Sequence, residues 1–177
     1  MKNIMILAIG GAGCNMAEAI KEKASDKWLR DASFVFLDTD AEHLSKFERD
    51  DRYSIILNGD LNDIPAELFN QVGSLIIVAG LGGNTTQKYI SEIIRHANID
   101  SGSDITIVAT TPFLFEGEER VAKATKTVSI IKDLGNVRIN LFNNEDLVKR
   151  FPDINFINAF ELADNAVLEL IENTLIP

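Results

Sequence analysis

The sequence predicts an α/β fold, a three-layer sandwich around a mostly parallel sheet. Short apolar runs typical of buried strands alternate along the chain with segments whose apolar residues recur at helical spacing. Glycines follow several of the apolar runs, where the chain must turn sharply into the next helix. This alternation is typical of parallel strands covered by helices on both faces. We therefore expect one Rossmann-like domain over residues 1–177.

The first half of the chain supplies three of these strand-and-helix units. Each expected strand is a short run rich in Ile, Leu, Val or Phe, and glycines or Asp and Thr residues stand before the helices. The second of these helices begins near Ala41, where Asp38 or Thr39 can cap it, and Asp40 is more often a cap than a ligand. The expected strands are 4–9, 34–37 and 53–57, and the other expected helices are 14–24 and a brief one at 66–71.

The second half repeats the pattern with longer helices. The helix expected at 85–97 has an apolar face made by five residues, and the last helix, 155–173, carries six at the same spacing. The expected strands are 75–79, 105–110 and 137–142, and a further helix is expected at 117–133. The two apolar faces are Tyr89, Ile90, Ile93, Ile94 and Ala97, and Phe156, Phe160, Ala163, Val167, Leu170 and Ile171.

Composition excludes several classes of function. The net charge of −10 argues against a nucleic-acid partner, which needs a basic face, and against an anionic membrane. No apolar stretch approaches the roughly 20 residues of a membrane span, and the N-terminus lacks the features of a signal peptide. Cys14 is the only cysteine, so no internal disulfide forms. We expect a cytoplasmic protein and assign no catalytic residue and no metal-binding residue.

Two glycine-rich segments, each between a strand and a helix, are the strongest functional signal. Glycines let a backbone approach a phosphate closely, and the helix that follows directs its first amides at the anion. The alternative is a pair of tight turns. No Gly-Lys-Ser/Thr follows the glycines, so this is not a P-loop, and we interpret Lys88 as a solvated helix residue. The candidate phosphate-binding residues are Gly10, Gly11, Ala12, Gly13, Cys14 and Asn15 in the first segment and Gly80, Leu81, Gly82, Gly83, Asn84 and Thr85 in the second.

A dinucleotide-binding protein of the NAD type is an alternative interpretation of the first segment. Asp38 ends the second strand, where an acidic residue can accept a hydrogen bond from a ribose hydroxyl. Met16, however, stands where the fingerprint requires a third glycine. The same Asp-rich segment contains His43, for which the sequence offers no partner, and we expect a surface histidine.

Later segments supply residues suited to a nucleoside. Phe160 and Asp164 lie one helical turn apart, so an aromatic face and a carboxylate point the same way. A purine can stack on the first, and the second accepts from guanine N1–H and the exocyclic amine but repels the N1 acceptor of adenine. Helical periodicity alone also explains Phe160 as a core residue. Glu116 and Arg120 are four residues apart and can form an ion pair.

Six segments in register resemble FtsZ, the bacterial cell-division GTPase of the tubulin superfamily. They are GGAGCN, LDTDAEHL (the family usually has Asn at Asp38), AGLGGNTTQ, TPFLFEGEER, FNNEDL and NAFELADNAVL. The resemblance spans nearly the whole chain. It implies GTP or GDP binding, with Mg²⁺ accompanying a triphosphate and the two glycine segments holding phosphates. It places Pro112, Glu116 and Arg120 at the ribose, Asn144, Phe160 and Asp164 at the guanine, and Asp38 and Thr39 close to the nucleotide.

The sequence also departs from the family pattern. Asn84, Thr86 and Lys88 replace glycines of the tubulin signature, and each adds a side chain where the backbone would approach phosphate. The family's third loop is missing, and Asp60 and Asp63 stand in that region, where they would repel a triphosphate unless a metal intervened.

The sequence ends at the central helix, before the family's acidic catalytic loop and its C-terminal activation domain. We therefore expect weak hydrolysis unless a partner supplies that loop, and no filament of the usual kind. The alternative is a regulatory or capping module with a vestigial pocket, which binds a full-length FtsZ-like protein or a second copy of this chain.

Overall fold

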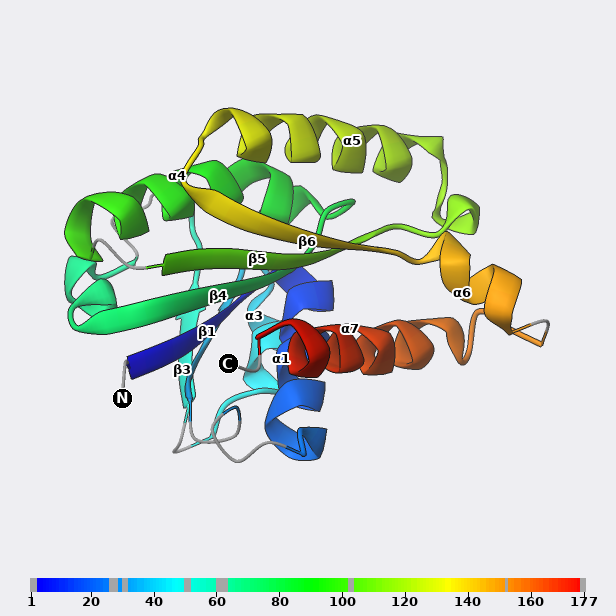
Figure 1. The fold of residues 1–177 in the computed structure, drawn as a ribbon, viewed down its shortest axis with the longest axis horizontal. Coiled ribbons are helices and arrows are strands. Elements are labelled where there is room, and N and C mark those ends of the chain that lie inside the picture. Colours follow the sequence, from blue (N-terminus) through cyan, green and yellow to red (C-terminus); the bar gives the residue numbers. More distant parts are fainter. Residues whose placement is uncertain are drawn as a thin grey trace.

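The sheet has six strands in the order β3-β2-β1-β4-β5-β6, and every neighbouring pair is parallel (Figure 1). The computed structural model describes residues 3–25, 29, 32–49, 52–59, 64–101, 104–151 and 153–175. The strands are β1 (Asn3–Ile9), β2 (Ser33–Asp38), β3 (Arg52–Ile56), β4 (Val72–Gly80), β5 (Asp104–Thr111) and β6 (Val137–Asn143). The predicted α/β fold with a parallel sheet is confirmed, because all six apolar runs form strands.

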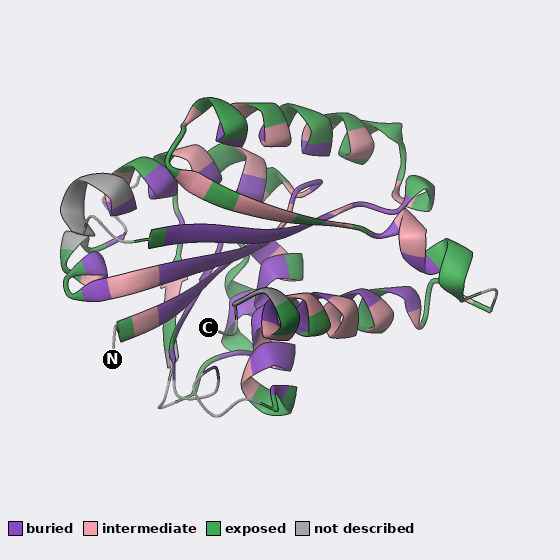
Figure 2. Cartoon of the chain, in the orientation of Figure 1, coloured by how far each residue is buried: buried purple, intermediate pink, exposed green. Residues whose placement is uncertain are grey.

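Helices cover both faces of the sheet. On one face lie α4 (Asn84–Ser101), α5 (Glu118–Asp133) and the short 3₁₀ helix η2 (Ala66–Phe69), and on the other lie α1 (Gly10–Lys23), α3 (Ala41–Ser45) and α7 (Ala159–Leu175). Alternate residues of β1 divide between the two cores: Leu7 and Ile9 face α4, and Ile6 and Ala8 face α1. Figure 2 shows the central strands as the most deeply buried part of the molecule. The continuous apolar runs are therefore strands buried on both faces.

The first helix begins four residues earlier than the sequence pattern indicated. No loop separates β1 from α1; Gly10 has φ +70° and turns the chain directly into the helix. Residues with a Cβ rarely adopt that conformation. The segment predicted as a phosphate loop is therefore the first turn of α1.

The C-terminal region also differs from the prediction. The last helix begins at Ala159, not at residue 155, and Phe156 lies in the preceding turn with 69% of its surface exposed. A short helix, α6 (Glu145–Arg150), and a 3₁₀ turn, η3 (Leu114–Glu116), were not predicted. The brief helix expected at 66–71 is a 3₁₀ turn that ends at Phe69. Asn70 has extended backbone angles and Gln71 has a positive φ, so neither continues the helix. Asp60 and Asp63 lie outside the described residues.

None of the described helices is long and apolar enough to cross a membrane.

The first helix packs exceptionally close to β4. A Cβ added to Gly13 would lie 2.5 Å from the carbonyl oxygen of Val78, and one added to Gly80 would lie 2.7 Å from the Cβ of Ala12. Because Val78 O belongs to the sheet backbone, it cannot move aside as a flexible side chain could. These two glycines set the distance between α1 and β4.

We expect Gly13→Ala to destabilise the protein by about 1–3 kcal/mol or more, as overpacking of a close-packed core does. Urea unfolding followed by circular dichroism measures the change. Gly11→Ala is the matched control, because its Cβ would meet only the His43 ring at 3.5 Å. That variant should unfold at the same or a higher urea concentration, since Ala favours a helix over Gly. Equal stability of the two variants would contradict the close approach.

Candidate nucleotide-binding site

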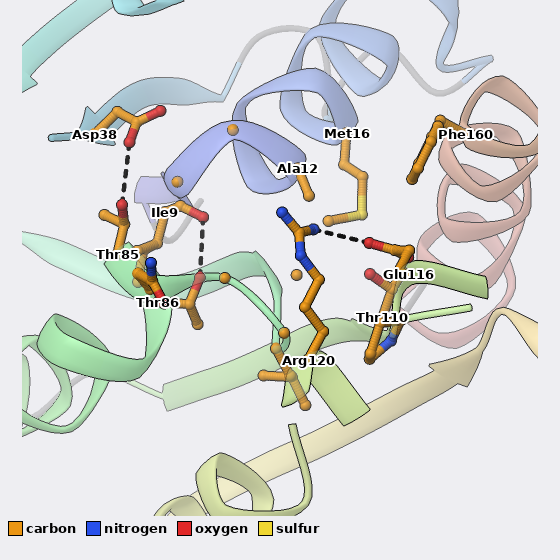
Figure 3. Close-up of a pocket in the computed structure, with 18 of the residues that line it drawn as sticks. Ile9, Ala12, Met16, Asp38, Thr85, Thr86, Thr110, Glu116, Arg120 and Phe160 are labelled. Atoms are coloured by element: carbon orange, nitrogen blue, oxygen red, sulfur yellow. Dashed lines mark hydrogen bonds and ion pairs between the residues drawn. The ribbon is translucent and has the colours of Figure 1, made fainter. Parts of the chain in front are cut away.

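The candidate site lies where the strand order reverses, between β1 and β4. From these neighbouring strands the chain continues into α1 on one face of the sheet and α4 on the other, so a crevice opens at the strands' carboxyl ends. A pocket of about 450 Å³ occupies this crevice (Figure 3). Pockets of this size hold small-molecule ligands and cofactors.

One end of the pocket is formed by the first turns of two helices. Gly10, Gly11 and Ala12 of α1 face the residues from Gly80 to Thr85 across it. Neither α1 nor α4 has an acidic residue in its own first turn, so neither helix compensates the positive end of its dipole from within. Unpaired amides at helix N-termini favour phosphate. This end suits an anion.

The three side chains that replace signature glycines turn away in different directions. Asn84 accepts a hydrogen bond from Lys123 Nζ of α5 at 2.7 Å. The Thr86 hydroxyl donates to the carbonyl of Ile9 at 3.4 Å, and it is buried. The Lys88 ammonium lies 5.0 Å from the ring centroid of Tyr89 and is not part of the pocket. Asn84 and Thr86 still border the pocket, so weaker contact with phosphate stays a prediction.

Asp38 connects β2 to the second glycine-rich segment, residues 80–85, which we call the signature segment. Its Oδ1 accepts hydrogen bonds from the Thr39 amide at 2.7 Å and from the Thr85 hydroxyl at 3.2 Å. Its Oδ2 lies 3.1 Å from Nδ1 of His43. His43 therefore has a partner that the sequence did not reveal, and its side chain is 21% exposed. Asp40 caps α3 by accepting from the His43 amide at 3.0 Å, which turns the ring toward the pocket.

Glu116 and Arg120 form the middle of the pocket. The Arg120 guanidinium donates to Glu116 Oε2 at 2.8 Å, which confirms the predicted ion pair, and Glu116 Oε1 accepts from the Phe113 amide at 2.9 Å. Pro112 is buried beside Gly82, where an added Cβ would lie 3.2 Å from the proline ring. In Figure 3 the Arg120 side chain extends toward Ala12 of α1. These groups can hold a polar, hydroxyl-bearing part of a ligand.

Asn144, Phe160 and Asp164 gather at the other end. Asn144 is 4% exposed, and its side-chain oxygen has no hydrogen-bond partner among the described residues. Phe160 is 46% exposed and meets Phe113 edge to face at 5.8 Å, so it is not the core residue that periodicity allowed. An unpaired buried acceptor beside an open aromatic face suits a planar heterocycle with donors on its edge.

Burial raises the pKa of Asp164 from 3.8 to about 7. Desolvation is the main cause; Glu161 adds to it, and Lys23 opposes it. The carboxyl group is therefore about half protonated at neutral pH. Donors from a ligand would favour the charged form.

Some predicted residues do not reach the pocket. Cys14 is fully buried, its thiol is 3.9 Å from the carbonyl of Leu37, and burial raises its pKa. Gly13 packs against β4, and Asn15 is exposed on α1 outside the pocket. The start of α1 at Gly10 explains this, because successive helical residues point in different directions. The other predicted site residues all border the pocket.

The pocket also contains residues that the sequence did not indicate. Met16 lies about two turns into α1. In the sequence it only counted against a dinucleotide fingerprint, and nothing indicated that it borders the pocket. Thr110 is the next-to-last residue of β5, and its carbonyl accepts a hydrogen bond from the Leu81 amide at 2.9 Å. His43 was signalled only by the Asp-rich segment around it. Met16, His43, Thr86, Thr110 and Ala163 belong to this group.

The charge of the pocket is unusual for an anion site. Asp38, Asp40, Glu116 and Asp164 border it, against one guanidinium, from Arg120, and the His43 ring. Among the described residues no group of three or more His, Cys, Asp or Glu side chains could hold a metal ion.

No family model matches the chain. The FtsZ of Haloferax mediterranei is 25% identical over an alignment of 193 positions, gaps included, which covers 96% of this chain and 48% of that protein. An FtsZ dimer from M. jannaschii superimposes with a TM-score of 0.77 at 22% identity, over 95% of this chain and 52% of that one. CetZ2 from Haloferax volcanii, solved as a GTPγS-bound protofilament, gives 0.74 at 14% identity, over 96% of this chain and 56% of that one.

The chain is similar to FtsZ in sequence and in fold. Its sequence aligns with FtsZ over almost its full length, and its sheet and helices superimpose on those of FtsZ and CetZ. The predicted resemblance is confirmed at the level of fold. The FtsZ-like chain spans about half the length of the curated relatives it matches.

We expect Asp164→Asn to stabilise the protein at neutral pH by at most about 4 kcal/mol, since each pKa unit corresponds to about 1.4 kcal/mol. The folded-state pKa lies above the unfolded value, so wild type loses stability as pH rises from about 4 to about 7. The gain should be absent near pH 4, grow to pH 7 and stay constant above. Urea unfolding across this range measures it. The exposed Glu169→Gln on the same helix is the control, and a similar pH profile for both variants would contradict the assignment.

Proposed function

We propose that this FtsZ-like domain binds guanine nucleotides, GDP or GTP, in the pocket between α1 and α4. The observation that carries the proposal is the unpaired, buried side-chain oxygen of Asn144 beside Phe160 and Asp164. Two helix N-termini at the opposite end favour the phosphates. Glu116 and Arg120 lie between the two ends, where the ribose would be held.

Guanine fits the base end better than adenine. An acceptor without a partner and a carboxylate both call for donors, and guanine offers N1–H and an exocyclic amine on one edge. Adenine offers an N1 acceptor there, which a charged carboxylate repels. Because a site with buried polar groups strongly rejects ligands that leave them unpaired, base selectivity should be substantial.

The relatives support this assignment and leave other parts of it open. One neighbour was solved with bound GTPγS as a protofilament, which makes a guanine nucleotide and self-association plausible here. Mg²⁺ would accompany a triphosphate through the oxygens of the phosphates. Weak hydrolysis without a partner's acidic loop and a cytoplasmic location stay predictions.

Titration calorimetry with GDP and ADP tests the guanine assignment. We expect GDP to bind more tightly than ADP, and the preference to increase from pH 6 to pH 8 by up to about tenfold per unit below pH 7. The reason is that the donors of guanine bind the charged form of Asp164. ADP carries the same phosphates as GDP, so ionisation of the phosphates cancels in the ratio.

Asp164→Ala should weaken GDP binding by about 1.5–3 kcal/mol, the usual worth of hydrogen bonds to a charged group, and leave ADP binding nearly unchanged. Glu169→Gln again serves as the control. Equal affinity for both nucleotides, or an Asp164→Ala variant that keeps the guanine preference, would sink the guanine assignment. NADH in the same titration tests the dinucleotide alternative, which requires it to bind more tightly than GDP.

A second candidate function is binding to another FtsZ-like chain through the surface beside the base end. Large apolar side chains are exposed there: Leu114 by 64%, Phe115 by 40%, Phe156 by 69% and Ile157 by 94%. Phe115 and Phe156 also stack edge to face at 4.4 Å, which fixes their exposed faces. Clustered exposed apolar groups mark interaction surfaces. The protofilament arrangement of a structural neighbour suggests a related chain as the occupant.

Co-sedimentation with a polymerising FtsZ measures this interaction. We expect wild type to enter or shorten the polymer and Ile157→Asp to lose the effect, because a buried charge opposes docking. Tyr53→Ser is the control; this residue is 62% exposed on β3, at the far edge of the sheet. If wild type leaves the relative's assembly unchanged, the interaction function is wrong.

A further inference from the structure

Asp38 lies at the end of the pocket farthest from the base-binding residues. It is the last residue of β2, and its carboxylate reaches the signature segment at Thr85. Figure 3 shows Asp38 and Thr85 together on one side and Phe160 and Glu116 on the other, with the first turn of α1 between them. A nucleotide whose base stacks on Phe160 therefore extends its phosphate chain toward Asp38.

Both oxygens of this carboxylate already have hydrogen-bond contacts with protein groups. It is 4% exposed, and donors from the Thr39 amide and the Thr85 hydroxyl meet one of its oxygens at 2.7 and 3.2 Å. The other oxygen is 3.1 Å from His43 Nδ1, and the His43 ring stands 3.5 Å from the position of a Cβ on Gly11. The ring and the carboxylate thus close the phosphate end beside the N-terminus of α1.

The same groups would be needed by the last phosphate of a long chain. An amide and a hydroxyl beside two helix N-termini are typical phosphate ligands, but here a protein carboxylate accepts from both. A further phosphate would bring another negative charge against this buried one, in surroundings where such repulsion is weakly screened. His43 is one imidazole and balances the carboxylate only when it is protonated.

We infer that Asp38, held by His43, makes the pocket selective for a nucleoside diphosphate over a triphosphate. The inference rests on the proposed guanine-nucleotide site and adds the residue that sets the length of the phosphate chain. A role for Asp38 as a Mg²⁺ ligand fits less well, because a cation would compete with the hydrogen-bond contacts that both carboxylate oxygens already make. Asp38 is thus a specificity-determining residue.

Dissociation constants of GMP, GDP and GTP, each measured with Mg²⁺ and with EDTA, test the inference. We expect wild type to bind GDP at least as tightly as GTP. Asp38→Asn removes the charge but keeps an oxygen that accepts from Thr39 and Thr85, so the fold should survive. We expect it to raise GTP affinity relative to GDP at least tenfold, which is about 1.4 kcal/mol.

Asp40→Asn is the matched control. It removes the same charge two residues away, from an exposed side chain that borders the pocket, and Asn caps α3 as well as Asp. The ratio of GTP to GDP affinity should change far less in this variant. Thermal unfolding of both variants separates a change in specificity from a change in stability.

Three results would overturn the inference. They are a wild-type protein that binds GTP tenfold more tightly than GDP, a ratio that Asp38→Asn leaves unchanged, and a loss of GTP affinity in Asp38→Asn that occurs only with Mg²⁺, which would make Asp38 a metal ligand. The first of these results needs only the wild-type protein, so it tests the inference even if Asp38→Asn does not fold. By contrast, failure of all three guanine nucleotides to bind any of the proteins overturns the proposed function itself, and this inference with it.

Discussion

The close approach of α1 to the backbone of β4 is the constraint on which the site depends. Only a residue without a Cβ fits at Gly13 against Val78, and only Gly80 leaves room for Ala12. This contact brings the start of α1 next to the signature segment, so the N-termini of α1 and α4 converge on one crevice. Without it, the two glycine segments would be separate turns at the edge of a parallel sheet.

The two ends of the pocket use carboxylates in opposite ways. Asp38 is buried but receives three hydrogen-bond contacts from protein groups, which compensate a buried charge. Asp164 lacks such compensation, and burial raises its pKa to about 7. The first carboxylate is therefore a fixed part of the wall, and the second is a group that a ligand with donors can ionise. In the function that we propose, they bias the pocket toward a ligand that is rich in donors at one end and short in phosphates at the other.

The sequence anticipated the sheet better than the helix ends and the side-chain partners. All six strands were predicted because strands buried on both faces need continuous apolar runs, which few other structures share. The start of α1 was missed because Gly10 makes the turn alone, and glycine runs look like loops. The helix α6 was missed because Glu145–Arg150 is too short for its periodicity to show. Phe160 fits a core pattern by spacing, yet it is 46% exposed because it borders the pocket, where it meets Phe113 edge to face.

The sequence by itself determined the order of the six strands and the long helices along the chain. It also determined the two glycine segments and the pairing of Glu116 with Arg120, because these depend on local spacing. It also determined the resemblance to FtsZ, which the comparisons confirm. Only the tertiary structure decided that His43 joins Asp38 and Thr85, that Cys14 points into the core, and that Asn144 is buried without a partner. Contacts between elements and the exclusion of water arise only when distant segments pack together, and no local pattern records them.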